Sequence, residues 1–281
     1  MAVILGLAAA ATYGAADFFG GLMTRRTGVF GVVLVSQVIG SAVFFLALPF
    51  LLQEEPTARA LLWGALAGMA GGAGVTLFYR ALALGRMSII APVTGVEAAI
   101  LPVMWGLASG ERPSGPALGG VVLAVTAVAL ISSGERADPS TRSRGLPPGL
   151  LHAFGAGAGF GVFFILLAEA GDDGGLWSLV SVRLASIALV GSVAIIGRRS
   201  IRPAPGTTRG IAAAGLFDMS ANLLYLLASR EGLLSIVAVL TSMYPATTVL
   251  LARFALGERM SRVQVLGLVA AGAGITLIGI G

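Results

Sequence analysis

The sequence predicts an all-α integral membrane protein of ten transmembrane helices, built as two inverted five-helix repeats. Hydrophobic residues make up 57% of its 281 positions and charged residues only 11%, whereas soluble domains carry about 25% charged residues. The apolar runs are long enough to cross the bilayer as helices, and the two halves of the chain align with each other. Lipid is therefore the expected solvent for most of the surface.

The expected membrane helices follow from the lengths of the apolar runs, because crossing roughly 30 Å of hydrocarbon takes about 20 helical residues. The runs do not alternate with period two, as strands of a membrane β-barrel would. They span residues 3–23, 29–52, 60–84, 88–108, 115–133, 149–169, 175–196, 208–229, 234–255 and 262–280.

An internal duplication organises these helices. A polar segment, residues 135–148, is predicted to link a first unit, residues 1–134, to a second, residues 149–281. A shift of 147 residues places Gly68 on Gly215, and the Gly-Glu-Arg turn at 110–112 on the one at 257–259. Because each unit has an odd number of helices, the second enters the membrane from the opposite side. Inverted repeats of this kind typically hold a substrate site near the midplane and work by alternating access.

The distribution of Arg predicts the orientation, since cytoplasmic loops carry an excess of positive charge. All 18 basic residues are Arg, and most lie in the loops after the first, third, fifth, seventh and ninth helices. This distribution places the central linker in the cytoplasm and both termini outside.

Four ionisable residues fall inside the expected helices, where charges are costly and usually face the bundle interior. They are Asp17, Glu97, Arg183 and Asp218. Removal of a carboxylate from water favours its protonated form, so each acid is a candidate to hold either a proton or a cationic substrate. Two structural alternatives stay open: Arg183 and Asp218 could form an ion pair that fixes helix packing, and Asp17 could be hydrated near the interface.

Polar and aromatic neighbours extend this candidate site. Tyr13 lies one turn before Asp17, and Asn222 and Tyr225 continue a stripe from Asp218. Tyr79 and Tyr244 are further candidates to line a pocket, with plain packing as the alternative. Asp17, Glu97 and Asp218 align with Phe164, Tyr244 and Gly71 in the other half, so the charges are not duplicated. The pattern indicates a symmetric frame around an asymmetric pocket.

Several chemistries are not expected from this composition. The chain has no cysteine and a single histidine, which leaves too few ligands for a metal site and no thiol nucleophile. The glycine runs lie in apolar helices without the Lys-Ser/Thr of a P-loop, so helix packing explains them better than nucleotide binding. No cofactor, enzymatic activity or nucleic-acid partner is expected.

The sequence resembles the EamA family of the drug/metabolite transporter superfamily. The resemblance is carried by the segment Tyr13-Gly14-Ala15-Ala16-Asp17-Phe18-Phe19, by the two Gly-Glu-Arg turns and by the ten-helix duplication. It implies a carrier in the bacterial plasma membrane, with a central cavity walled by the first, third, fourth, sixth, eighth and ninth helices. Arg183 lies on the seventh. Glu111 and Glu258 of the turns are expected to cap helix N-termini rather than to bind substrate.

The sequence therefore predicts a secondary-active transporter of a small organic solute, such as a metabolite, an amino acid or a drug-like cation. It is expected to be an exporter that works by proton antiport or substrate exchange. Its partners would be the solute and the lipid bilayer, with a monomer or a homodimer as the assembly. Two alternatives remain, a passive channel or signalling subunit, and an intramembrane enzyme.

Overall fold

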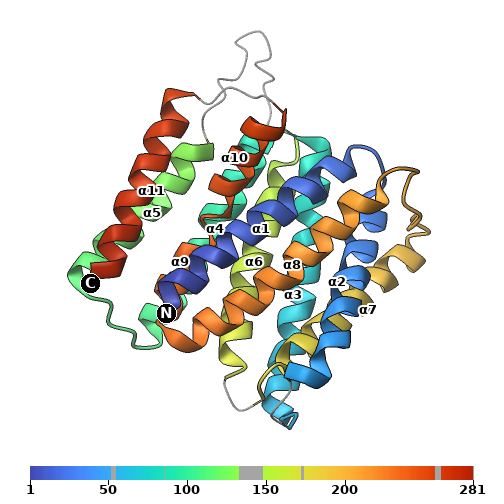
Figure 1. The fold of residues 1–281 in the computed structure, drawn as a ribbon, viewed down its shortest axis with the longest axis horizontal. Coiled ribbons are helices and arrows are strands. Elements are labelled where there is room, and N and C mark those ends of the chain that lie inside the picture. Colours follow the sequence, from blue (N-terminus) through green and yellow to red (C-terminus); the bar gives the residue numbers. More distant parts are fainter. Residues whose placement is uncertain (52–54, 86, 133–147, 172–173, 257–260, 281) are drawn as a thin grey trace.

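The computed structural model describes residues 1–51, 55–85, 87–132, 148–171, 174–256 and 261–280. Throughout these residues the regular structure is α-helical (Figure 1). The helices are α1 (Ala2–Thr24), α2 (Val29–Leu51), α3 (Ala58–Leu84), α4 (Met87–Ala108), α5 (Gly115–Ser132), α6 (Leu150–Glu169), α7 (Trp177–Ile196), α8 (Thr208–Glu231), α9 (Leu234–Thr241), α10 (Tyr244–Leu256) and α11 (Arg262–Ile280).

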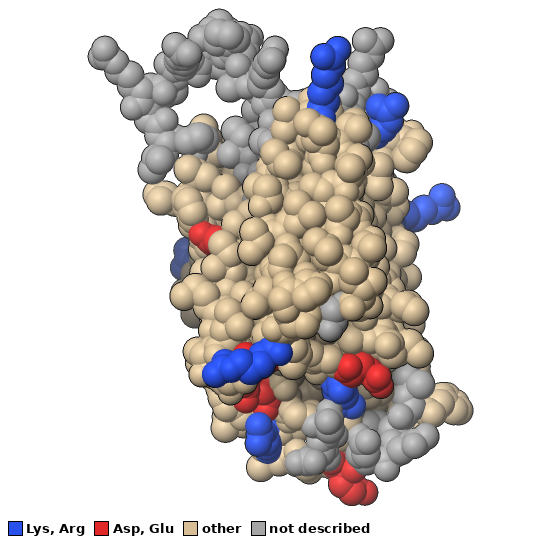
Figure 2. Space-filling model, turned by 90° about the vertical axis from the view of Figure 1, so that its left-hand side faces the viewer, with Lys and Arg blue, Asp and Glu red and all other residues tan. Residues whose placement is uncertain are grey.

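The predicted fold class is confirmed, with ten membrane-crossing segments. In the parts of the chain that the structure describes, 8 segments are long and apolar enough to span a membrane, and two shorter apolar helices lie within α4 and α5. On the face shown in Figure 2, the surface between the two ends carries few charges, while Arg side chains project at the upper end and both signs mix near the lower end. Large apolar side chains such as Phe50, Ile196 and Phe254 are exposed, as expected for a surface in contact with lipid.

The ninth expected helix, residues 234–255, is broken into α9 and α10. Pro245 explains the interruption, because proline has no N–H to donate to the carbonyl of Thr241 and its ring crowds that carbonyl. The chain turns through Ser242 and Met243, whose N–H groups donate to Ala238 and Leu240. The break lies near the middle of the bundle, where irregular backbone is tolerated only when protein surrounds it.

The helix packing is itself two-fold symmetric between the halves. Under the 147-residue shift, α1, α2 and α3 correspond to α6, α7 and α8, while α4 corresponds to α9 with α10, and α5 to α11. The pair α1 with α8 thus corresponds to α6 with α3, and α3 with α7 corresponds to α8 with α2; all four are in extensive contact. The α5–α11 pair, at one edge in Figure 1, corresponds to itself. The halves therefore interlock about a pseudo-two-fold axis.

Gly68 and Gly215, aligned by sequence, hold equivalent places in this packing. A Cβ on Gly68 of α3 would collide with the carbonyl of Val182 on α7, and one on Gly215 of α8 with the carbonyl of Ser36 on α2. Small residues let backbones approach this closely. The two glycines thus bring α7 and α2 against the centre of the bundle from opposite sides of the axis.

Some predicted features lie outside the described residues. The second Gly-Glu-Arg turn, including Glu258, is one of them, and nearly all of the 135–148 linker is another.

Candidate substrate cavity

A cavity lies between the two halves, with about 740 Å³ of empty space including its opening. Its walls come from α1, α2, α3, α6, α7, α8 and α10. The lining residues are Tyr13, Asp17, Val33, Ser36, Gln37, Gly68, Gly71, Gly72, Val75, Tyr79, Phe160, Phe163, Phe164, Val182, Arg183, Ser186, Asp218, Asn222 and Tyr244.

The cavity straddles the pseudo-two-fold axis, because many lining residues come as repeat counterparts. Both members of the pairs Tyr13/Phe160, Asp17/Phe164, Ser36/Arg183, Gly71/Asp218 and Val75/Asn222 line it. In each of these pairs that contains a charged residue, the residue at the corresponding position of the other repeat is uncharged. The frame of the cavity is therefore symmetric and its charge is not.

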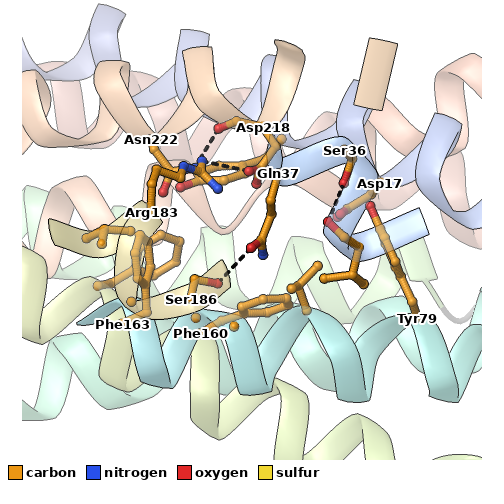
Figure 3. Close-up of a pocket in the computed structure, with 18 of the residues that line it drawn as sticks. Asp17, Ser36, Gln37, Tyr79, Phe160, Phe163, Arg183, Ser186, Asp218 and Asn222 are labelled. Atoms are coloured by element: carbon orange, nitrogen blue, oxygen red, sulfur yellow. Dashed lines mark hydrogen bonds and ion pairs between the residues drawn. The ribbon is translucent and has the colours of Figure 1, made fainter. Parts of the chain in front are cut away.

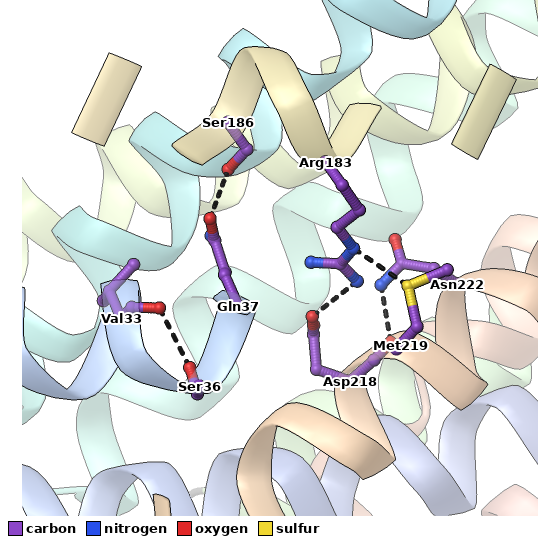
Figure 4. Close-up of polar contacts among 8 residues, drawn as sticks. All are labelled: Val33, Ser36, Gln37, Arg183, Ser186, Asp218, Met219 and Asn222. Carbon is purple, nitrogen blue, oxygen red and sulfur yellow. Dashed lines mark hydrogen bonds and ion pairs between the residues drawn. The ribbon is translucent and has the colours of Figure 1, made fainter. Parts of the chain in front are cut away.

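An ion pair between α7 and α8 crosses the cavity wall. The Arg183 Nη2 atom lies 2.7 Å from Asp218 Oδ2, with the Arg183 side chain 5% exposed and that of Asp218 31%. Arg183 Nε also donates to Met219 Sδ at 3.0 Å, and Asn222 Nδ2 donates to the Asp218 backbone carbonyl at 2.6 Å (Figure 4). The guanidinium is thus held against α8.

Asp17 lies in the same cavity, on α1, near Tyr79 (Figure 3). Among the described residues its carboxylate has no ion-pair partner, since the one guanidinium of the lining belongs to Asp218. The hydroxyl of Tyr13, one turn away, is buried and has no hydrogen-bond partner among the residues that the structure describes. Two acids against one Arg give the described lining a formal charge of −1 when both acids are ionised.

Gln37 and Ser186 add a second polar contact, which the sequence interpretation missed. The Ser186 hydroxyl donates to Gln37 Oε1 at 3.1 Å, joining α7 to α2 (Figures 3 and 4). Both side chains are buried, and both line the cavity. A signal was present in the sequence: Ser36, Gln37 and Ser41 interrupt the apolar run of α2.

The cavity lies nearer one end of the bundle than the other. Tyr79 is close to the end of α3 and Val33 close to the start of α2, on the side of the Arg-rich loops. Toward the other end, Phe164 and Tyr225 pack with ring centroids 4.5 Å apart, and the Tyr225 hydroxyl donates to the Phe164 carbonyl at 2.8 Å. This aromatic contact lies between the cavity and the side that carries the termini.

Seven of the nine sequence-predicted site residues line this cavity, namely Tyr13, Asp17, Tyr79, Arg183, Asp218, Asn222 and Tyr244. Tyr225 lies fully buried in the aromatic contact just described. Glu97 lies between α4 and α6, against Gly157, and not in the lining. Its role in proton coupling stays a prediction, as do the roles of the other eight.

The cavity walls differ from those implied by the resemblance. Both α2 and α7 contribute lining residues, and α4 contributes none in the described part of the chain. The close approach of α3 to α7 at Gly68 explains the difference, since it brings Val182, Arg183 and Ser186 up to the central space. Arg183, which the resemblance placed off the cavity wall, therefore lies in it.

The two-fold frame around a central cavity agrees with a family-level match. The model of the EamA-like transporter family matches residues 1–133 and 147–280, which is most of each half. The chain belongs to the EamA-like transporter family.

Comparison with solved structures supports the fold of this EamA-family chain. A structure described only as "Crystal structure of protein" superimposes with a TM-score of 0.76 at 17% identity, covering 99% of this chain and 96% of that one. At this identity the likeness extends to the fold alone. Comparison with curated proteins finds no match.

The Gly-Glu-Arg turn after α4 is a capping device, as expected from the sequence. The Glu111 carboxylate accepts from the backbone N–H of Leu234 at 2.7 Å and of Ser235 at 3.0 Å. These two N–H groups begin α9, in the other half of the chain, and the positive end of the helix dipole favours an anion there. Glu111 therefore fastens the first half to the broken helix of the second, away from the cavity.

Proposed function

We propose that this EamA-family protein is a secondary carrier that exchanges protons for a small organic cation or zwitterion by alternating access. The observation that carries the proposal is a central cavity, straddling the pseudo-two-fold axis, that holds the unpaired carboxylate of Asp17 beside the Arg183–Asp218 ion pair. Inverted repeats with a site at their interface are a recurring architecture of secondary transporters.

The charges of the lining support competition between a proton and a cation. Because Arg183 neutralises Asp218, Asp17 carries the one uncompensated charge among the described lining residues. A carboxylate partly removed from water is stabilised by a bound cation or by a proton. One group that accepts either, but not both, couples the two movements.

The rest of the lining suggests the shape of the solute. Aromatic rings from Phe160, Phe163 and Tyr79 form an apolar wall, which suits a solute with an apolar or aromatic part. The faces of such rings also attract cations. The Gln37 amide and the Arg183 guanidinium offer donors near the same space. An amphipathic cation or zwitterion satisfies both.

The direction of transport follows from the antiport. In a bacterial plasma membrane protons move inward down their gradient, so an antiporter drives the solute outward. We therefore propose an exporter in that membrane, present as a monomer or a homodimer. With the termini outside, as the Arg distribution predicts, the cavity lies nearer the cytoplasm, where an exporter loads.

A ligand screen at two pH values tests the proposal. The purified protein would be melted with amino acids, polyamines, quaternary ammonium compounds, sugars and nucleobases at acidic and alkaline pH. A ligand at about 100 times its dissociation constant should stabilise the fold by roughly 2.7 kcal/mol. Cations and zwitterions should stabilise more at alkaline pH, where protons no longer compete.

Transport of the best ligand would follow in proteoliposomes. Uptake that saturates, counter-exchanges and responds to an imposed pH gradient is the expected result. Non-saturating flux without counter-exchange would point to a passive channel. Ligands that bind equally well at both pH values would contradict proton competition.

A further inference from the structure

Among the residues that the structure describes, two buried polar atoms in α4 and α9 have no hydrogen-bond partner, and both lie where the repeats correspond. Glu97 Oε2 is one, and the hydroxyl of Thr241, a residue with 0% exposure, is the other. Such atoms are uncommon in folded proteins, and each calls for an explanation. Because an unsatisfied buried polar atom raises the free energy of the present state, a conformation in which it gains a partner is favoured relative to this one.

The repeat gives each of these atoms a counterpart that is satisfied. Under the 147-residue shift Glu97 corresponds to Tyr244, and Thr241 corresponds to Thr94. The Tyr244 hydroxyl donates to Thr94 Oγ1 at 3.1 Å. The two orphaned atoms therefore belong to the symmetry-related copy of a hydrogen bond that is present on the other side of the axis.

The backbone around the two pairs corresponds as well, so the comparison is between equivalent places. A Cβ on Gly14 of α1 would meet the carbonyl of Tyr244, and a Cβ on Gly161 of α6 would meet the carbonyl of Glu97. Gly14 and Gly161 are themselves repeat counterparts. The two equivalent positions differ in what surrounds the side chain: Tyr244 lines the cavity, while Glu97 lies beside Gly157 between α4 and α6.

Inverted repeats convert one open state into the other by exchanging the conformations of the two halves. We infer that Glu97 and Thr241 form a hydrogen bond in the oppositely open state, replacing the Tyr244–Thr94 bond of the present one. In that state Glu97 takes the place beside the cavity that Tyr244 holds now. The inference rests on the proposed alternating access and adds a second carboxyl group, which lines the cavity in one state only.

This arrangement gives Glu97 a different task from Asp17. Asp17 faces the cavity in the present state, whereas Glu97 would join it only after the halves exchange. A carboxyl group that enters the cavity at one stage of the cycle, near a threonine hydroxyl, can release or take up its proton at that stage. The coupling would then depend on the state of the protein as well as on the occupancy of the site.

Accessibility of an introduced cysteine measures the two states without any substrate. The chain has no cysteine of its own, so Leu226→Cys supplies a single reactive thiol. Leu226 is 1% exposed and is the counterpart of Tyr79, which lines the present cavity. In the opposite state it should line the cavity, so its rate of reaction with a membrane-impermeant maleimide in nanodiscs reports that state. Val180→Cys is a second reporter of opposite sign if the first does not fold: Val180 is partly exposed now and its counterpart Val33 is 0% exposed, so labelling at Val180→Cys should fall where labelling at Leu226→Cys rises.

Substitutions in the two bonds should change this rate in opposite directions. Tyr244→Phe removes the bond of the present state and should raise labelling roughly fivefold, the shift expected for one hydrogen bond. Thr241→Val and Glu97→Leu each remove the bond of the opposite state and should lower labelling by a similar factor. The double variant should be no lower than either single one, because both remove the same interaction.

The matched control is Ser41→Ala. The Ser41 hydroxyl is also buried without a partner in the described residues, but its counterpart is Ala188, so no symmetry-related bond exists and labelling should not change. Glu97→Gln keeps a hydrogen-bonding group and should label like the parent while losing pH coupling in transport.

The inference fails if Thr241→Val leaves the rate unchanged or raises it, if the double variant adds the two effects, or if Tyr244→Phe leaves the reporter unreactive. These results are separate from the fate of the proposed function. If Asp17→Asn loses pH-dependent ligand binding while Thr241→Val has no effect on labelling, proton antiport is supported and the Glu97–Thr241 bond is rejected. If labelling follows the expected pattern but no ligand competes with protons, the Glu97–Thr241 bond is supported and proton antiport is rejected.

Discussion

The Arg183 guanidinium and the Asp218 carboxylate lie 2.7 Å apart, joining α7 to α8 at the cavity wall. The two ends of this ion pair are unequally buried, with 5% of the Arg183 side chain exposed and 31% of that of Asp218. The arginine therefore depends on the pair more than the aspartate does, because a buried charge without a partner is costly.

Asp218→Asn should destabilise the fold by about 3 kcal/mol, the lower end of the range for breaking a buried pair, because Asp218 is partly open to the cavity. The measurement is thermal unfolding in detergent. The double variant Arg183→Met with Asp218→Leu should recover most of the loss, since apolar replacement leaves no buried charge. If Asp218→Asn melts like the parent, the pair does not stabilise this state.

The fold was readable from the sequence because its causes are local or repeated. Run lengths predict where helices cross the bilayer, and an odd-numbered duplication predicts their inversion. The break at Ser242–Met243 was missed, although its cause, Pro245, stands in the sequence. A proline only weakens a helix at a known position, and the surrounding packing decides whether it kinks or ends.

The candidate site was only partly readable for a different reason. Charge inside an apolar helix singled out Asp17, Arg183 and Asp218, which the structure brings to one cavity. It singled out Glu97 equally well, because an acid inside an apolar run gives the same signal in the sequence whichever neighbouring helix it faces. Which face of α4 meets the cavity depends on packing between distant helices, and no spacing along one helix contains that information.

Asp17→Asn should leave the protein folded and remove the pH dependence of ligand stabilisation. An amide of the same shape fits the site but neither gains nor loses a proton. The test is the difference in ligand-induced melting shift between acidic and alkaline pH, which should fall close to zero. Glu169→Gln is the control, since Glu169 is an acid near the end of α6, outside the cavity lining. A pH response that survives in Asp17→Asn would assign proton competition to another group.

Glu111→Ala should cost about 2 kcal/mol, near the upper limit for loss of a helix cap, because the carboxylate accepts two N–H groups of α9. Hydrogen exchange at the amides of Leu234 and Ser235 should accelerate first. Glu231→Ala, an exposed acid at the end of α8, is the matched control and should change neither quantity. Equal exchange in both variants would show that Glu111 does not hold the start of α9.

Gly68→Ala and Gly215→Ala should destabilise the protein by similar amounts, about 1–3 kcal/mol each, because either new Cβ meets a facing carbonyl and forces two helices apart. The equality is the specific expectation, since the two glycines occupy equivalent places about the pseudo-two-fold axis. Gly272→Ala is the control: its Cβ would meet nothing within 4 Å, so helix propensity should make the change neutral or slightly stabilising. Thermal unfolding of the three variants compares them directly. A large cost at Gly68 with none at Gly215 would mean that only one of the two close approaches supports the fold, and that the symmetry of the packing does not extend to its energetics.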